Sequence, residues 1–199
     1  MTKRLPSKYS VCKKLKSSYK NLWGVKKKDS CRSVIGKKRK RLSPFGRLLN
    51  IKQSLKFFYS NINESSFKVY IKSSVKSPSK TIDKLCSFLE TRIDTIIYRS
   101  CLVNSFQEAR QLINHGFVFV NDTRISVSNK KIHKNDIVKL NLTSFDKNTF
   151  LKSILSRSIP NYLELDLNNF TIILLWDVNF KNTYYPIREK YVDINRYYN

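Results

Sequence analysis

The sequence predicts an α+β protein. A basic N-terminal extension and a helical domain precede a second domain, in which two packed helices cover a small, mostly antiparallel sheet. Apolar residues from Ile82 to Ile97 recur at helical spacing. Ser105 and Glu108 form a capping box for a second helix, which Gly116 can end. Short apolar runs separated by polar turns follow, which is typical of strands.

The positive charge is concentrated in the first part of the chain. The 199 residues carry a formal net charge of +25. Residues 1–80 hold 23 Lys and Arg against two acids, a net charge of +21, whereas residues 81–199 carry only +4. This excess favours a polyanionic partner, because phosphates release condensed counterions when cations bind them. Aromatic residues within the first 80 positions predict partial order there, since disordered segments are usually poor in them.

The first 80 residues are expected to contain an extension over residues 1–43 and a helical domain with a linker over residues 44–80. The basic run at residues 37–41 is expected to be extended. Ser43-Pro44 predicts the start of a helix that has proline in its first turn. A second short helix is expected at residues 65–71, and residues 73–80 are expected to form the linker.

The second domain is expected to span residues 81–183, followed by a C-terminal tail over residues 184–199. Thr81 is expected to cap its first helix, along which Arg92 and Arg99 would lie on one face because they are seven residues apart. Strands are expected at residues 117–120, 124–127, 137–142, 162–166 and 170–178, turns at 121–122 and 134–136, and a helix at 147–157.

Residues that enzymes use for catalysis are scarce in this chain. Its two histidines, His115 and His133, belong to no nucleophile or metal motif, and no Gly-rich phosphate loop is present. His115 could either contact RNA or stabilise a helix end. The four cysteines form no CxxC pair, so we expect free thiols and no structural zinc. Neither a catalytic site nor a cofactor is expected. The longest apolar run, at residues 172–176, is too short to cross a bilayer.

Three arginines are the strongest candidates for a binding surface. Arg92, Arg99 and Arg110 are expected to form one RNA-facing patch, because guanidinium groups suit phosphate oxygens and stack on unpaired bases. The alternative is that these arginines pair with Glu90, Asp94 or Glu108.

At these residues the chain closely resembles the S-four RNA-binding domain. The resemblance is carried, in order, by residues 89–94 (LETRID), 98–99 (YR), 108–113 (EARQLI), 115–116 (HG) and 135–138 (NDIV). Outside that domain, residues 40–46 (KRLSPFG) and 160–166 (PNYLELD) resemble the small-subunit ribosomal protein S-four family, although Tyr162 stands where tryptophan is common.

The resemblance implies a structural component of the small ribosomal subunit. Such a protein binds small-subunit ribosomal RNA, nucleates assembly and lines the region where messenger RNA enters, beside proteins of the S-three and S-five families. It also implies that the C-terminal tail returns to the N-terminal domain. An RNA-modifying enzyme of the pseudouridine synthase type and a free ribosome-associated factor remain alternatives. The candidate RNA-binding residues are Lys37, Lys38, Arg39, Lys40, Arg41, Arg47, Lys52, Arg92, Arg99, Arg110, Gln111, His115, Asn121, Lys130 and Lys131.

The composition also bears on localisation. The chain has a single alanine, Ala109, and four glycines, and it favours residues with AT-rich codons. Because the resemblance begins almost at Met1, no room is expected for a cleaved presequence. We therefore expect a protein encoded by an organelle and located in the mitochondrial matrix, with the plastid or a bacterial cytoplasm as alternatives.

Overall fold

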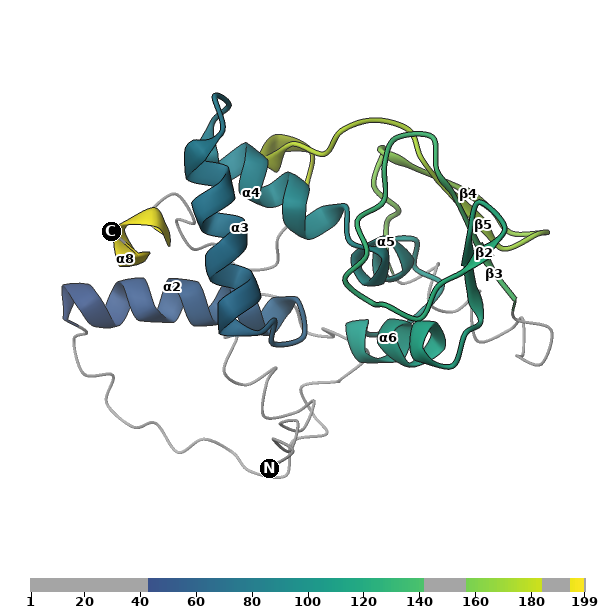
Figure 1. The fold of residues 1–199 in the computed structure, drawn as a ribbon, viewed down its shortest axis with the longest axis horizontal. Coiled ribbons are helices and arrows are strands. Elements are labelled where there is room, and N and C mark those ends of the chain that lie inside the picture. The colour runs from purple at the N-terminus through teal and green to yellow at the C-terminus, as the bar shows by residue number, and fades with distance from the viewer. Residues whose placement is uncertain (1–42, 142–156, 184–193, 199) are drawn as a thin grey trace. The chain divides into compact units, whose positions relative to one another are not determined.

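The structure is a computed structural model of the chain, and it describes residues 43–141, 157–183 and 194–198. The chain divides into two compact units, one formed by Met1–Ile71 with Tyr185–Asn199 and the other by Lys72–Tyr184. Figure 1 shows helices in the first unit, and helices and a sheet in the second. The basic run at residues 37–41 and almost all of the helix expected at residues 147–157 lie outside the described residues.

Helix α2 of the first unit spans Pro44–Phe58 and begins where the sequence predicted. The Ser43 hydroxyl accepts a hydrogen bond of 3.1 Å from the amide of Gly46, and this contact caps the helix. The short helix α8, Asn195–Tyr198, packs against α2. The rings of Phe45 and Tyr197 are stacked there, with their centroids 5.6 Å apart.

Helix α3 spans Glu64–Lys76 and is longer than the expected helix at residues 65–71. The expectation of a linker from residue 73 onward is therefore wrong for residues 73–76. Serines 73 and 74 are tolerated within the helix, and the first residue that opposes a helix is Pro78.

In the second unit the expected long helix is divided in two. Helix α4 spans Thr81–Glu90 and helix α5 spans Ile93–Arg99, with Arg92 in an extended conformation between them. The amide of Ile93 donates to the carbonyl of Lys130 at 3.0 Å, so a residue distant in sequence stabilises the break between the two helices. The expected cap is also wrong, because Thr81 is the first helical residue and Lys80 precedes it without a capping side chain.

Helix α6, Phe106–Asn114, has the expected capping box. The Ser105 hydroxyl accepts from the amide of Glu108 at 3.2 Å, and the Glu108 carboxylate accepts from the amide of Asn104 at 2.8 Å. After the helix, Gly116 has φ +78°, and a Cβ at this position would lie 1.9 Å from Nη2 of Arg124. The positive φ favours glycine here, and any larger residue would also displace the Arg124 guanidinium from its place over the backbone.

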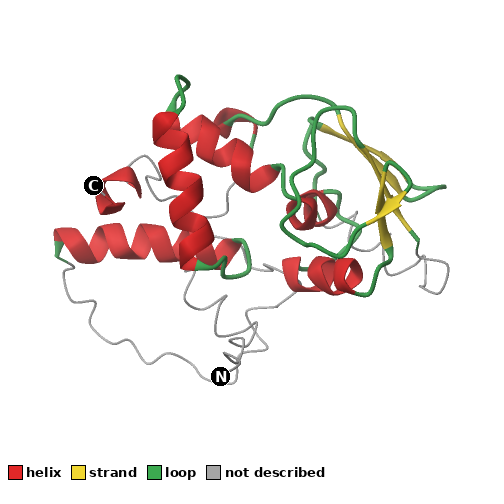
Figure 2. Cartoon of the chain, in the orientation of Figure 1, coloured by secondary structure: helices red, strands yellow, loops and turns green. Residues whose placement is uncertain are grey.

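The sheet has the strand order β2-β1-β3-β5-β4, and every neighbouring pair is antiparallel. Four of the expected strands are present but shorter: β1 Val118–Val120, β3 Ile137–Leu140, β4 Leu163–Asp166 and β5 Thr171–Leu174. The strand expected at residues 124–127 is wrong for residues 125–127, because β2 spans only Thr123–Arg124. The expected turn at Asn121 and Asp122 is confirmed, since both residues have positive φ. Helices α5 and α6 lie together on one side of the sheet (Figures 1 and 2). The α+β class is therefore confirmed.

The core of this unit lies between these two helices and the sheet. Ile93, Ile97, Ala109 and Ile113 are fully buried, as is Val118 of the sheet. Among the described residues, no helix combines the length and the apolar character that a membrane span requires.

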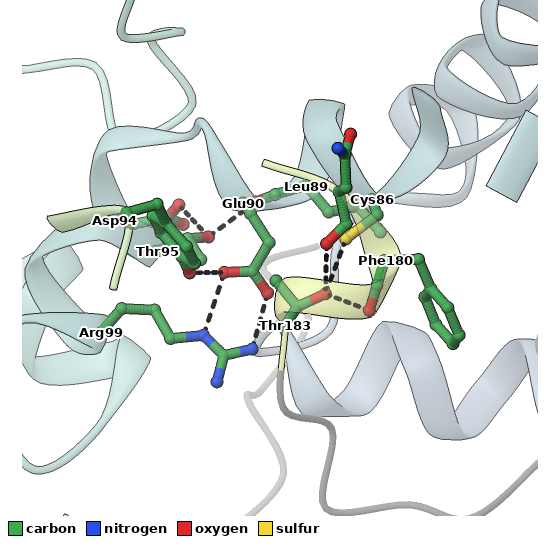
Figure 3. A network of polar contacts seen from close by, with 10 residues as sticks. Cys86, Leu89, Glu90, Asp94, Thr95, Arg99, Phe180 and Thr183 are labelled. Atoms are coloured by element: carbon green, nitrogen blue, oxygen red, sulfur yellow. Dashed lines mark hydrogen bonds and ion pairs between the residues drawn. The ribbon is translucent and has the colours of Figure 1, made fainter. Parts of the chain in front are cut away.

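A polar contact holds the 3₁₀ helix η3, Phe180–Asn182, against α4. The carboxylate of Asp83 accepts from the amide of Phe180 at 3.1 Å. The thiol of Cys86 and the hydroxyl of Thr183 lie 3.1 Å apart, and Figure 3 shows the two side chains facing each other. The segment after the sheet is therefore fastened to the first helix of the unit.

Candidate nucleic-acid interface

A buried carboxylate ends helix α4. Glu90 is fully buried and accepts two hydrogen bonds from Arg99, of 2.9 Å from Nε and 2.6 Å from Nη2 (Figure 3). It also accepts from the hydroxyl of Tyr162 at 3.0 Å. Burial and the neighbouring negative charge of Glu90 raise the pKa of Tyr162 well above its usual value. This network joins both helices at the break to the segment that leads into β4.

A second buried carboxylate, Asp94, lies in the first turn of α5 and is 1% exposed. Arg92 donates to its two oxygens from Nε at 3.0 Å and from Nη2 at 2.9 Å. Arg110 on α6 donates from Nε to the same carboxylate at 2.8 Å. Asp94 therefore joins α5 to α6 through Arg110 and holds Arg92 at the start of α5.

The structure corrects the expected arrangement of the three arginines. Arg92 is 5% exposed and lies at the helix break, so it does not share an exposed helix face with Arg99. The alternative pairing with Glu90 and Asp94 is the one observed, whereas Glu108 is used in the capping box. Of the three side chains Arg110 is the most accessible, at 24%. That Arg92 and Arg99 contact RNA remains a prediction, and the burial of both side chains argues against it.

Several other candidates gather near the start of α5. The Lys130 carbonyl accepts from Ile93, and the backbone of Lys131 forms a bridge with Arg92. Both lysines are exposed, and the Lys131 ammonium lies 5.6 Å from the ring centroid of Phe88. Arg110 reaches the same region through Asp94, and Gln111, the next residue on α6, is exposed. The structure thus brings Arg110, Lys130 and Lys131 together although they are far apart in sequence.

Two further candidates have structural roles. His115 is the exposed C-cap residue of α6, and its carbonyl accepts from Nη2 of Arg124 at 3.1 Å. The side chain of Asn121 donates to Asp136 at 2.9 Å and accepts from the amide of Ile137 at 3.0 Å. Partial burial would raise the pKa of Asp136, but the hydrogen bonds from His133 and Asn121 outweigh it and lower the pKa. Asn121 therefore joins the two turns at one end of the sheet.

Sequence reasoning missed two arginines that organise this unit. Arg157 donates to the carbonyls of Tyr98 at 3.3 Å, Cys101 at 3.5 Å and Val103, and so holds the loop between α5 and α6. Arg124 crosses Gly116 to reach the end of α6. No pattern along the chain pointed to Arg157, because its partners lie more than fifty positions away.

In the first unit, Lys52 is buried rather than available on the surface. Its ammonium lies 3.0 Å from a carboxylate oxygen of Glu64 and 4.0 Å from the ring centroid of Tyr197. Lys56 and the hydroxyl of Tyr198 also donate to Glu64. The expectation that Lys52 is available to phosphate is therefore not supported by its position, whereas Arg47 on α2 is exposed.

This cluster predicts an acid-sensitive contact between α8 and the rest of its unit. Partial burial would raise the pKa of Glu64, but hydrogen bonds from Lys56, Tyr198 and Lys52 outweigh it and hold the pKa at about 2, below the ordinary 4.5. The stabilisation is therefore complete above the ordinary pKa and is lost as the pH falls through the folded value. We expect the NMR chemical shift of the Glu64 carboxyl carbon to change with pH with a midpoint at about pH 2.

The matched control is Glu164, which is exposed and has no ion pair among the described residues. Glu64→Gln should remove part of the stability loss on acidification between pH 4.5 and about 2, and Glu164→Gln should not. A titration midpoint of Glu64 near 4.5 would contradict the contact.

Known proteins resemble this chain along nearly its whole length. A family model described as the S4 domain matches residues 91–138. Small ribosomal subunit protein uS4 of Rhodospirillum rubrum is 32% identical over 195 residues, which cover 94% of this chain and 94% of that relative. The proteins of the same name from Acidiphilium cryptum and from Rhodopseudomonas palustris strain BisB5 are 34% and 32% identical, covering 83% and 86% of each chain. These relatives are bacterial.

Proposed function

The chain belongs to the family of small ribosomal subunit protein uS4, and we propose on this basis that it is a structural component of the small ribosomal subunit that binds the subunit's RNA. The observation that carries the proposal is the similarity over 94% of both chains, which includes the S4 domain and the segments around it. The net charge of +25 fits a phosphate-rich partner. We propose no enzymatic activity, since the relatives are named as ribosomal proteins.

We propose that RNA contacts the surface around the start of α5 together with the basic extension. Arg110, Gln111, Lys130 and Lys131 would supply the contacts there, with His115 and Asn121 at the end of α6 and at the turn after β1. Arg92 would act by positioning, since it shares the Asp94 carboxylate with Arg110. Arg47 and residues 37–41 would bind phosphates from the first unit.

More specific roles follow from the family resemblance and the composition. We propose that the protein binds early in assembly and borders the channel where messenger RNA enters, beside proteins of the S-three and S-five families. We propose the mitochondrial matrix as its location, supported by the preference for residues with AT-rich codons. Locating the coding region in a sequenced organelle genome would test that location directly.

Sedimentation tests the ribosomal role. The endogenous protein should remain with small subunits in gradients at high salt, because an integral component is held by many contacts. Release into the light fractions would favour a free ribosome-associated factor instead. An RNA-modifying enzyme would be indicated by loss of a modified nucleotide from the RNA when the gene is deleted.

A double substitution tests the surface at the start of α5. Lys130→Gln with Lys131→Gln should weaken binding to a small-subunit ribosomal RNA fragment. The slope of log K against log salt should flatten by about 1.4 to 1.8, since each lost phosphate contact contributes about 0.7 to 0.9. Fluorescence anisotropy at a series of salt concentrations measures the slope.

The control for this double substitution is Lys181→Gln, which removes an exposed lysine on η3 and should leave the slope unchanged. Circular dichroism should show the same helix content in all the variants. An unchanged slope in the double variant would reject this surface.

A further inference from the structure

One face of the sheet carries a row of side chains that crosses all five strands. The strand register aligns Arg124 with Phe119, Phe119 with Lys139, Lys139 with Thr171, and Thr171 with Asp166. Directly paired residues of neighbouring strands project to the same side of a sheet. The row therefore begins with a cation at β2, passes an aromatic ring and a second cation, and ends with an acid at β4.

This row lies on the side of the sheet opposite the helices. The residues that alternate with it in β1 and β3 are all buried: Val118, Val120, Val138 and Leu140. Figure 1 shows α5 and α6 on one side of the strands, so the row lies on the opposite side, and only the guanidinium of Arg124 at its end reaches the carbonyl of His115 after α6. Arg124 and Lys139 are exposed, Phe119 is half-buried, and the neighbouring Ile137 is 46% exposed.

Arg124 and Lys139, the two cations beside Phe119, have N–H groups that can still donate hydrogen bonds to a ligand. Within the described part of the chain, the ammonium group of Lys139 has neither an ion-pair nor a hydrogen-bond partner, and the ring of Phe119 has no aromatic partner. Arg124 gives one hydrogen bond to the carbonyl of His115, and a guanidinium group has five donors. An accessible aromatic ring between two cations suits a nucleotide whose base is unpaired, because its base can stack while its phosphates bind the cations.

The acidic edge of the same face limits where a polyanion can lie. Asp166 ends the row, and Glu164 projects from the same side of β4 because it pairs with Ile173, which in turn pairs with Ile137. Phosphates would be repelled there, so favourable charge is confined to β2, β1 and β3.

We propose that this half of the outer sheet face, Arg124, Phe119 and Lys139, binds an unpaired stretch of RNA. One base stacks on Phe119, and the adjoining phosphates bind Arg124 and Lys139. The inference deepens the proposed function and rests on it, since the RNA of the small subunit would supply the strand. It adds a second contact surface, on the side of the sheet away from the α5 surface.

Substitution of the ring tests the stack. Phe119→Leu keeps an apolar side chain but removes the aromatic face. In the full-length protein, affinity for a short labelled oligouridine should fall about tenfold, within the range known for one base–aromatic stack. Affinity for the same strand built with stable abasic spacers should be unchanged, because that strand has no bases to stack. Equal loss for both strands would overturn the stacking assignment.

Substitution of the lysine tests the phosphate contact. Lys139→Gln should flatten the slope of log K against log salt by about 0.7 for both strands, since each phosphate contact to a single strand contributes that amount. Lys181→Gln removes the same charge outside the sheet and should not change the slope. Phe119→Leu should lower affinity without changing the slope. A slope unchanged by Lys139→Gln would overturn the phosphate assignment.

Photocrosslinking locates the strand on the protein. With 4-thiouridine in the oligonucleotide, the adduct should lie in the tryptic peptide of residues 111–124, which contains Phe119. Adducts confined to other peptides would overturn the inference. The same holds if both variants bind RNA normally but reconstituted subunits lose a neighbouring protein, because the face would then dock protein.

An incorrect sheet-face site and an incorrect proposed function would give different experimental results. If the wild-type chain binds small-subunit RNA and sediments with subunits while Phe119→Leu has no effect, only the sheet-face site is wrong. If the wild-type chain does neither, the proposed function itself is wrong.

Discussion

Replacing Glu90 with glutamine is expected to lower the free energy of unfolding by about 3–5 kcal/mol, the usual cost of breaking a buried ion pair from one side. Glu90 is fully buried, and the Arg99 side chain is only 11% exposed. The substitution would leave a guanidinium charge largely removed from water without its counter-ion. It would also weaken the hydrogen bond from the hydroxyl of Tyr162. Urea denaturation followed by circular dichroism measures the change.

Two comparisons make this expectation specific to the ion pair. Glu164→Gln, at an exposed position, should change stability by no more than about 0.5 kcal/mol. Glu90→Met combined with Arg99→Met and Tyr162→Phe removes the buried carboxylate together with the guanidinium and the hydroxyl that donate to it, and should recover part of the loss, because neither charge of the pair is left buried alone. A cost below about 1 kcal/mol for Glu90→Gln alone would contradict a buried pair.

Replacing residues 37–41 with glutamines is expected to have the largest effect on RNA affinity. The run Lys37, Lys38, Arg39, Lys40 and Arg41 carries five of the positive charges of the chain. If most of them contact phosphate, the slope of log K against log salt should flatten by about 3 to 4. Affinity at about 0.1 M salt would then fall by roughly three orders of magnitude or more. Filter binding to a small-subunit RNA fragment over a salt series measures both quantities.

A rearranged run is the control for charge against order. A variant with the same five residues in another order should bind like the wild type, since phosphate contacts depend on charge and reach. A wild-type slope near −2, in place of the about −7 to −9 expected from some ten contacts, would reject the proposal that the extension clasps RNA.

Short-range chemistry explains most of what could be predicted from the sequence. The start of α2 at Pro44, the capping box at Ser105 and the turn at Asn121 each depend on residues within four positions of one another. The strands were recognisable as short apolar runs separated by polar turns. Their ends were placed too far out, because the length of a strand depends on how far its partner extends.

The order of the local motifs along the chain also indicated the right family, because such a series of motifs can be recognised in the sequence without knowledge of the tertiary structure. The pairing of the arginines could not be chosen on that basis. Glu90, Asp94 and Glu108 were all plausible partners at helical spacing, and spacing alone does not show which side of a helix is buried.

Local sequence was thus sufficient for the fold class, the starts of α2 and α6, the turn at Asn121 and Asp122, and the family, because each rests on contacts between near neighbours or on their order. Tertiary packing decided the break between α4 and α5, where the carbonyl of Lys130 takes the amide of Ile93. It also decided that Arg92 and Arg99 stabilise the scaffold while Arg110 stays partly accessible, and that Lys52 meets Glu64. The physical reason is burial: whether an arginine or lysine faces phosphate or a carboxylate depends on what covers it, and the covering residues come from distant parts of the chain.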